Sequence, residues 1–400
     1  MTGNAVGDCF GYSVSTAGDI NNDGYDDIIV GADGKSSLQG AAYVIYGGEE
    51  SSFLSIDFST TSLDPLTTGF MISGNAAGDY FGYSVSTAGD INNDGYDDII
   101  VGAPRKSSFQ GAAYVIYGGP KSAMSNIVLS STALNPTSTG FMVTGNAVDN
   151  YLGFSVKTAG DINNDGYDDI IIGAYGKNSN QGAAYVIYGG EKSSMSNLYL
   201  SIQTLDPLAT GFLMTGYAVN DEFGNSVSTA GDINNDGYDD IIVGAHGKNN
   251  NQGAVYVIYG GGKSSMTNIY LSSVTLDPLT TGFIITGDAV GDNFGSWATP
   301  AGDFNNDGFA DIIIGAYSKG VAYLVSAGIL FLFFQDLMTN IAQCTTFCNQ
   351  CSSLSGCTEC KNSYYLYLSE CLSSCPKATF TSTDTCKSNF IFIFHQINHP

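Results

Sequence analysis

The sequence predicts an all-β fold, a β-propeller built from four-stranded blades. One segment recurs five times at a constant spacing of 71 residues, and each copy contains four short stretches typical of strands. Gly (51 residues) far outnumbers Pro (9) without a collagen period, as expected for many turns between short strands. A four-stranded sheet repeated at this period covers its neighbour, as in a propeller. A solenoid would repeat faster, and separate domains of this size would bury too little surface.

The repeat defines the domain organisation. Residues 17–27 return in every copy, and the first aspartates of the five loops are Asp19, Asp90, Asp161, Asp232 and Asp303. We therefore expect a propeller over residues 1–326, a linker over 327–343, a cysteine-rich module over 344–387 and a tail over 388–400. In the second copy, the A, B, C and D strands are predicted at 81–87, 98–103, 112–117 and 140–143.

The sequence leaves closure of the ring open. Residues 1–4 resemble residues 214–217, the end of a D strand, while the fifth repeat stops after its C strand near Val325. In one interpretation, the N-terminal segment supplies the missing strand and closes a five-bladed ring. In the other, further blades lie upstream and the five repeats are part of a larger propeller.

The charge balance favours cations as partners. The chain has 38 acidic and 13 basic residues, a formal net charge of −25, which repels nucleic acid and anionic membranes. A solvated acidic surface is the plain alternative, but these carboxylates recur at fixed spacing. The apolar run 324–334 is too short for the roughly 20 residues of a membrane span, so no transmembrane segment is predicted. No secretory signal is visible at the start of the chain.

Each repeat carries a loop of the form D-x-N-x-D-G-x-x-D, which predicts a calcium site. In the first loop, Asp19, Asn21 and Asp23 occupy positions 1, 3 and 5, the Tyr25 carbonyl position 7 and Asp27 position 9. These are hard oxygen ligands of the kind Ca²⁺ takes in sets of six to eight. The loops cover residues 19–27, 90–98, 161–169, 232–240 and 303–311. The ligands expected in the other four loops are Asp90, Asn92, Asp94, Tyr96 and Asp98; Asp161, Asn163, Asp165, Tyr167 and Asp169; Asp232, Asn234, Asp236, Tyr238 and Asp240; Asp303, Asn305, Asp307, Phe309 and Asp311.

The same residues argue against two alternatives to a calcium site of this kind. A helical EF-hand is excluded because position 12 is Val30, where a bidentate Glu is needed, and because the flanks are strand-like. An Asx-turn without metal fits a single D-x-N-x-D-G, but fits five full copies less well. Position 8 is Asp in four loops and Ala310 in the fifth, so a carboxylate there is dispensable in at least one blade. We expect a structural metal that ties down the A–B hairpin, without a catalytic role.

The residues flanking the loops resemble the FG-GAP repeats of integrin α-subunit propellers. Phe81-Gly82 precedes the second loop and Gly102-Ala103-Pro104 follows it. The Phe-Gly pair recurs at Phe10, Phe223 and Phe294 and is Leu152-Gly153 in the third copy; the Gly-Ala pair recurs at Gly31, Gly173, Gly244 and Gly315. The resemblance implies a calcium-binding extracellular or cell-surface propeller used for adhesion or protein recognition. Propellers of this family usually have seven blades.

A binding partner is expected on one face of the ring. Alternating strands place the A–B and C–D connections on one face and the B–C and D–A connections on the other. Many differences between the copies fall in the second set, including Tyr175, His246 and Tyr317. This face is therefore a candidate surface for an unknown protein or glycan, with drift at exposed loop tips as the alternative.

Eight of the nine cysteines lie between Cys344 and Cys386, which predicts a disulfide framework and an oxidising compartment. Zinc bound by the two C-x2-C pairs is the alternative. With Cys371, Cys375 and Pro376, the segment resembles the furin-like repeats of surface receptors. Cys9 has no counterpart in the other repeats and is expected to be incidental.

Neither a nucleophile motif, a metal-hydrolase motif nor a phosphate loop is present, so we expect no enzyme. The function predicted is recognition, with a structural spacer or a non-catalytic fragment of a larger FG-GAP protein as the alternatives.

Overall fold

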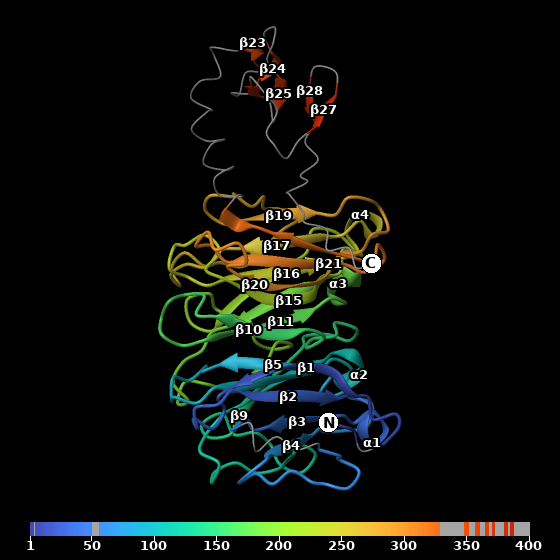
Figure 1. Cartoon of the computed structure of the whole chain (residues 1–400), viewed down its shortest axis with the longest axis vertical. Helices are drawn as coiled ribbons and strands as arrows, with labels where there is room; N and C mark the ends of the chain where they lie inside the picture. Colours follow the sequence, from blue (N-terminus) through green and yellow to red (C-terminus); the bar gives the residue numbers. More distant parts are fainter. Residues whose placement is uncertain are drawn as a thin grey trace.

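The computed structural model describes residues 1–3, 5–49 and 56–328, and the backbone of six short strands between residues 348 and 387. The all-β prediction is confirmed, and the five repeats form five sheets in a propeller-like arrangement. Figure 1 shows the first two repeats (blue to cyan) at one end of the repeat region, the third (green) between, and the fourth and fifth (yellow to orange) at the other end.

Strands A to D of each repeat pair in sequence order, antiparallel throughout. The first sheet contains β1 (Phe10–Gly18), β2 (Asp27–Ala32), β3 (Ala41–Ile45) and β4 (Gly69–Ser73); the second β5 (Ser84–Gly89), β6 (Asp98–Ala103), β7 (Ala112–Ile116) and β9 (Gly140–Thr144); the third β10 (Val156–Gly160), β11 (Asp169–Ala174), β12 (Ala183–Ile187) and β14 (Gly211–Thr215); the fourth β15 (Phe223–Gly231), β16 (Asp240–Ala245), β17 (Ala254–Ile258) and β19 (Gly282–Thr286); the fifth β20 (Phe294–Gly302), β21 (Asp311–Ala316) and β22 (Val321–Val325). Within the described residues, the fifth sheet ends after its C strand, as predicted.

Four short turns and six C-terminal strands of the described chain lie outside these sheets. The B–C connections contain short turns at α1 (Lys35–Leu38), α2 (Lys106–Phe109), α3 (Lys177–Asn180) and α4 (Lys248–Asn251). Their inner residues are left-handed, for example Ser36 (φ 52°) and Ser37 (φ 60°), so these are tight turns and not ordinary helices. The C-terminal strands are β23 (Cys348–Cys351), β24 (Cys357–Cys360), β25 (Tyr365–Tyr367), β26 (Glu370–Leu372), β27 (Phe380–Ser382) and β28 (Thr385–Lys387).

The predicted start of the second A strand was wrong by three residues. Strand β5 begins at Ser84, and Phe81 forms an isolated bridge with Gly40 of the first repeat. Tyr80 and Gly82 take positive φ values of 58° and 87°. The Phe-Gly step is therefore the point at which the chain crosses from one sheet to the next.

The C–D connections of the second, third and fourth repeats each add a fifth, two-residue strand to the sheet before them. Strand β8 (Ile127–Val128) pairs parallel with β4, β13 (Leu198–Tyr199) with β9, and β18 (Ile269–Tyr270) with β14. Four strands per repeat were predicted, and this return pairing was not. A two-residue strand carries too little pattern to stand out in a sequence.

The N-terminal segment takes the place of a D strand beside the C–D connection of the first repeat, because Thr2 and Asp57 correspond to Ser73 and Val128 one repeat later. Thr2 forms a parallel bridge with Asp57; its N–H donates to the Ile56 carbonyl (2.9 Å), and its carbonyl accepts from the Phe58 N–H (3.1 Å). Among the described strands, no pairing joins the first sheet to the fifth. Closure of the ring through the fifth sheet is therefore not seen among the described residues, and both interpretations of the repeat number stay predictions.

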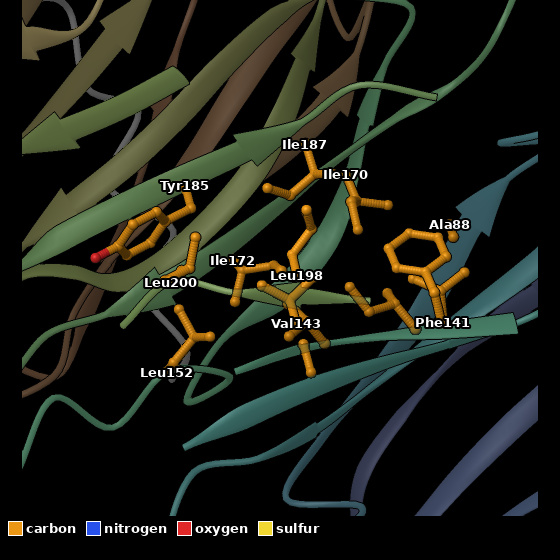
Figure 2. Close-up of a cluster of buried hydrophobic side chains, with 14 of the residues drawn as sticks. Ala88, Phe141, Val143, Leu152, Ile170, Ile172, Tyr185, Ile187, Leu198 and Leu200 are labelled. Atoms are coloured by element: carbon orange, nitrogen blue, oxygen red, sulfur yellow. The ribbon is translucent and has the colours of Figure 1, made fainter. Parts of the chain in front are cut away.

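The hydrophobic core lies between consecutive sheets. Figure 2 shows one such layer, in which Phe141 and Val143 of the second repeat pack against Ile170 and Ile172 of the third. Phe141 is 1% exposed and the other three are 0% exposed. Both faces of an interior sheet are buried in this way, which explains why each B strand reads as an unbroken apolar run rather than an alternation.

Side chains on the two end sheets are more exposed than their counterparts on interior sheets. Val14 of the first sheet is 65% exposed, whereas its counterpart Val85 is 2% exposed. In the fifth loop Phe304 is 67% exposed, whereas Ile233 at the same position of the fourth loop is 1% exposed. Among the described residues, the outer faces of the end sheets thus carry the residue types that are buried elsewhere.

Consecutive A strands are also joined by polar contacts. The Ser13 hydroxyl accepts a hydrogen bond from the Val85 N–H (3.0 Å), and Ser84 and Ser155 repeat this contact with the next strands. The Lys157 ammonium lies 3.4 Å from the Ser15 hydroxyl, which joins the third repeat to the first. Contact between sheets two places apart indicates that the A strands curve round a common axis.

Position 8 of the loops has a structural role that the sequence did not reveal. The Asp97 carboxylate accepts a hydrogen bond from the Asp19 N–H of the preceding loop (2.8 Å). Asp168 and Asp239 do the same for Asp90 and Asp161, each at 2.9 Å. The fourth loop lacks this bond because position 8 of the fifth loop is Ala310.

We call the hydrogen bond from the Asp19 N–H to the Asp97 carboxylate the position-8 clamp. Its contribution to stability is measurable with a matched pair of variants. We expect Asp97→Ala to lower the free energy of unfolding by about 1–2 kcal/mol, because it leaves the Asp19 N–H without its charged acceptor. Asp26 holds the same position in the first loop but is exposed, so Asp26→Ala should change stability by less than about 0.5 kcal/mol. Urea unfolding compares the two; equal losses would contradict the clamp.

Candidate metal loops and the opposite face

The backbone of each loop is shaped by its own aspartates. Asp19 accepts hydrogen bonds from the Asp23 N–H (3.0 Å) and the Gly24 N–H (2.8 Å), and Asp23 accepts one from the Tyr25 N–H (3.1 Å). Asn22 and Gly24 have φ values of 53° and 89°, a region that Asn and Gly tolerate best. This folding gathers the oxygens of positions 1, 3 and 5 on one turning segment.

The position-9 aspartate is buried beneath the loop. Asp27 is 0% exposed, and its carboxylate accepts from the Ile20 N–H (3.1 Å), the Asn21 Nδ2 (2.9 Å) and the Gly47 N–H (2.7 Å). This carboxylate therefore fastens the start of the loop to the end of the C strand, in addition to any role as a ligand.

Burial changes the protonation of these position-9 carboxyls. Desolvation raises the pKa of Asp27 to about 6 and that of Asp240 to about 8, against hydrogen bonds that lower it. The same cause raises the pKa of Asp98 and Asp169 well above the usual value, with nearby aspartates adding to the shift. Each buried carboxylate is thus destabilised as an anion, and a bound cation would relieve this.

The position-3 asparagines provide a test of whether a cation fits. In the first three loops, the Oδ1 atoms of Asn21, Asn92 and Asn163 are buried and have no hydrogen-bond partner. A buried carbonyl oxygen without a donor is costly, and a cation would satisfy it. In the fourth and fifth loops, Asn234 and Asn305 turn their Oδ1 to the N–H of position 5, each at 2.9 Å. The donor set and the unpartnered oxygens of the first three loops fit a calcium ion.

The carboxylates alone do not form a ready-made cage. Within the described residues, no three His, Cys, Asp or Glu side chains come together closely enough to hold a metal. Any ion would also need the asparagine and backbone oxygens, as the D-x-N-x-D-G pattern predicts. The assignment of the ligands in all five loops remains a prediction.

Lysines on the same face were missed at the sequence level. The Lys121 ammonium lies 2.6 Å from Asp23 Oδ2, and Lys263 lies 2.5 Å from Asp165 Oδ2. These lysines belong to C–D connections and the aspartates to A–B loops, so the prediction that both connections share one face is confirmed. Each lysine lies 98 residues after its aspartate, as Lys121 does after Asp23. This constant spacing in the sequence is the signal from which the pairs could have been predicted.

The B–C and D–A connections share the other face, as predicted. Lys35 and Lys106 of B–C turns lie 3.6 Å from Asp8 and Asp79 of D–A connections. Of the residues singled out for recognition, Tyr317 is 77% exposed. Tyr175 is partly buried and stacks on Tyr151, with ring centroids 5.0 Å apart, and His246 pairs with Glu222 at 2.8 Å.

Together, the fold and the loops define a class: a propeller-like β-repeat protein with an aspartate-rich loop in every repeat. The FG-GAP repeat family matches residues 10–45, 81–116, 155–187, 223–258 and 294–332. The chain belongs to the FG-GAP repeat proteins, and its propeller is similar to those of integrin α chains.

Proteins similar to this chain include three integrin α chains. Integrin alpha pat-2 of Caenorhabditis elegans is 32% identical over 250 residues, covering 60% of this chain and 18% of that protein. Integrin alpha-8 and integrin alpha-V of Gallus gallus are 26% and 28% identical, each covering 62% of this chain and 21% of theirs. The chain thus spans about a fifth of the length of these relatives.

The C-terminal predictions lie largely outside the described residues. Apart from the backbone of the six strands, the structure does not describe the segment from Cys344 to Cys386, so its disulfides and its furin-like character stay predictions. Cys9 is a free, exposed thiol. No helix within the described part of the chain is both long and apolar enough to cross a membrane.

Proposed function

We propose that this chain is a calcium-binding recognition module of the cell-adhesion class, located outside the cell or at its surface, and not an enzyme. The observation that carries the calcium proposal is the buried, unpartnered Oδ1 of the position-3 asparagine in three consecutive loops. The role assigned to calcium is structural, since each loop joins strands A and B and the first three loops are hydrogen-bonded to the next blade. The similarity to integrin α chains supports the adhesion class.

Thermal melting tests the calcium proposal. At about 1 mM calcium and a dissociation constant near 10⁻⁴ M, each occupied loop contributes roughly 1.4 kcal/mol to stability. We therefore expect the melting temperature to rise clearly with calcium, to fall with a chelator and to respond less to magnesium at equal ionic strength. A melting temperature unmoved by both calcium and chelator would refute calcium binding.

We further propose that a protein or glycan partner binds on the B–C and D–A face. This face carries many of the differences between repeats, including the exposed Tyr317, whereas the aspartate-rich loops occupy the other face. The B–C turns hold consecutive non-glycine residues in the left-handed region, a strain often found at functional sites. A glycan array and a cell-attachment assay, run with wild type and a Tyr175/His246/Tyr317 triple alanine variant, test this surface; binding that survives the triple variant would refute it.

A further inference from the structure

The first three loops differ from the last two in one charged contact. Lys121, Lys192 and Lys263 reach from the C–D connection of the following repeat to the position-5 aspartates Asp23, Asp94 and Asp165. In the fourth and fifth loops, the position-5 carboxylates of Asp236 and Asp307 instead accept from the position-3 amides, at 3.0 Å and 2.9 Å. Within the described residues these two carboxylates have no ion pair.

Each of the three lysines contacts both a tyrosine ring and an aspartate carboxylate. The Lys121 ammonium lies over the ring of Tyr46, 4.9 Å from its centroid, in addition to its contact with Asp23. Lys192 and Lys263 lie 5.0 Å from the ring centroids of Tyr117 and Tyr188. A cation above an aromatic face and beside a carboxylate is held in place by both. The same pair of contacts recurs at three junctions between consecutive blades.

The lysine and the expected calcium use the same oxygen. Position 5 is one of the four side-chain ligands expected in each loop, and its Oδ2 contacts the ammonium in the first three loops. The unpartnered Oδ1 of Asn21, Asn92 and Asn163, each at least nine-tenths buried, belongs to these same three loops. A calcium ion must therefore share or displace the lysine there, but not in the fourth and fifth loops.

We propose that Lys121, Lys192 and Lys263 act as tethered competitors of calcium, so that the five loops form two classes of site. This inference rests on the proposed calcium binding. The first three loops have the lower affinity, because an ammonium already neutralises one of their carboxylates. The fourth and fifth loops fill first. At low calcium, the lysines also hold the first three loops against the neighbouring blades.

Calorimetric titration of the full chain with calcium chloride tests the proposal. Replacing the three lysines with glutamine (Lys121→Gln, Lys192→Gln, Lys263→Gln) removes the competitor and keeps much of the side-chain length. Since a partly exposed ion pair contributes up to about 1 kcal/mol, we expect about a fivefold higher affinity at three sites and no change at the other two. The single variant Lys263→Gln should tighten one site by the same factor, which keeps the test valid if the triple variant folds poorly.

A matched control has the same change in net charge on the opposite face. Lys35, Lys106 and Lys248 pair with Asp8, Asp79 and Asp221 at 3.6, 3.6 and 3.4 Å. Their triple glutamine variant should leave every calcium affinity within about twofold of wild type, because these lysines do not contact the loops. Equal tightening in this control, or unchanged affinities in the loop variants, would overturn the competitor role. If wild type and all variants bind no calcium, the proposed function fails and this inference fails with it.

Discussion

Replacing Asp98 with alanine is expected to destabilise the protein by at least about 3 kcal/mol, with or without calcium. Asp98 is 0% exposed, and its carboxylate accepts from the Ile91 N–H (3.1 Å), the Asn92 Nδ2 (2.8 Å) and the Gly118 N–H (2.8 Å). Alanine leaves three buried donors without an acceptor, each costing about 1–3 kcal/mol. Urea unfolding in a chelator measures the loss.

Asp94 of the same loop is the control for this prediction. It is an expected calcium ligand as well, but its side chain is 28% exposed and pairs with Lys192 on the surface. Asp94→Ala should therefore cost about 1 kcal/mol or less in a chelator and lower the calcium response of the melting temperature. If both variants lose the same stability without calcium, the distinction between the buried position 9 and the exposed position 5 is wrong.

The second large effect is a pH dependence of the metal-free protein. An unfolded Asp has a pKa near 3.8, whereas burial raises the folded pKa of Asp27 to about 6 and that of Asp240 to about 8. Between these values the folded state holds protons that the unfolded state has released, so this contribution to stability is full below about pH 4 and is lost as pH rises through the folded pKa. We expect the melting temperature in a chelator to fall from pH 5 to pH 8.

Calcium should remove most of this slope, since a cation stabilises the deprotonated carboxylates. Calorimetry at pH 5, 6, 7 and 8, with and without calcium, gives both curves. Asp240→Asn should flatten the chelator curve above pH 6, because it removes the group that titrates highest among those with a defined value. If the melting temperature in a chelator rose with pH across this window, the raised pKa values of the position-9 carboxyls would be contradicted.

The sequence predicted the repeats and the loops well for a physical reason. The five copies are nearly identical, so each strand and loop is read five times, and the run of Asp98–Ala103 matches β6 residue for residue. The assignment of connections to two faces follows from strand alternation alone, and the Lys121–Asp23 and Lys35–Asp8 pairs agree with it.

The contacts between blades could not be predicted from the sequence. The clamp from Asp97 to Asp19 and the return strand β8 join residues 78 and about 55 positions apart, and no local pattern marks their partners. The predicted likeness of the N-terminal segment to a D strand agrees with its contact, because Thr2 pairs with Asp57 as Ser73 pairs with Val128 one repeat later. This contact does not identify the sheet to which the segment belongs.

The central claim is that the loops of this FG-GAP protein hold calcium through their own side chains. Anomalous diffraction from crystals grown in millimolar calcium tests it most directly. We predict a calcium peak in each of the five loops, within about 2.3–2.6 Å of the position 1, 3 and 5 oxygens, with Lys121, Lys192 and Lys263 displaced. Ordered loops without a peak, with the lysines still on their aspartates, would contradict the account.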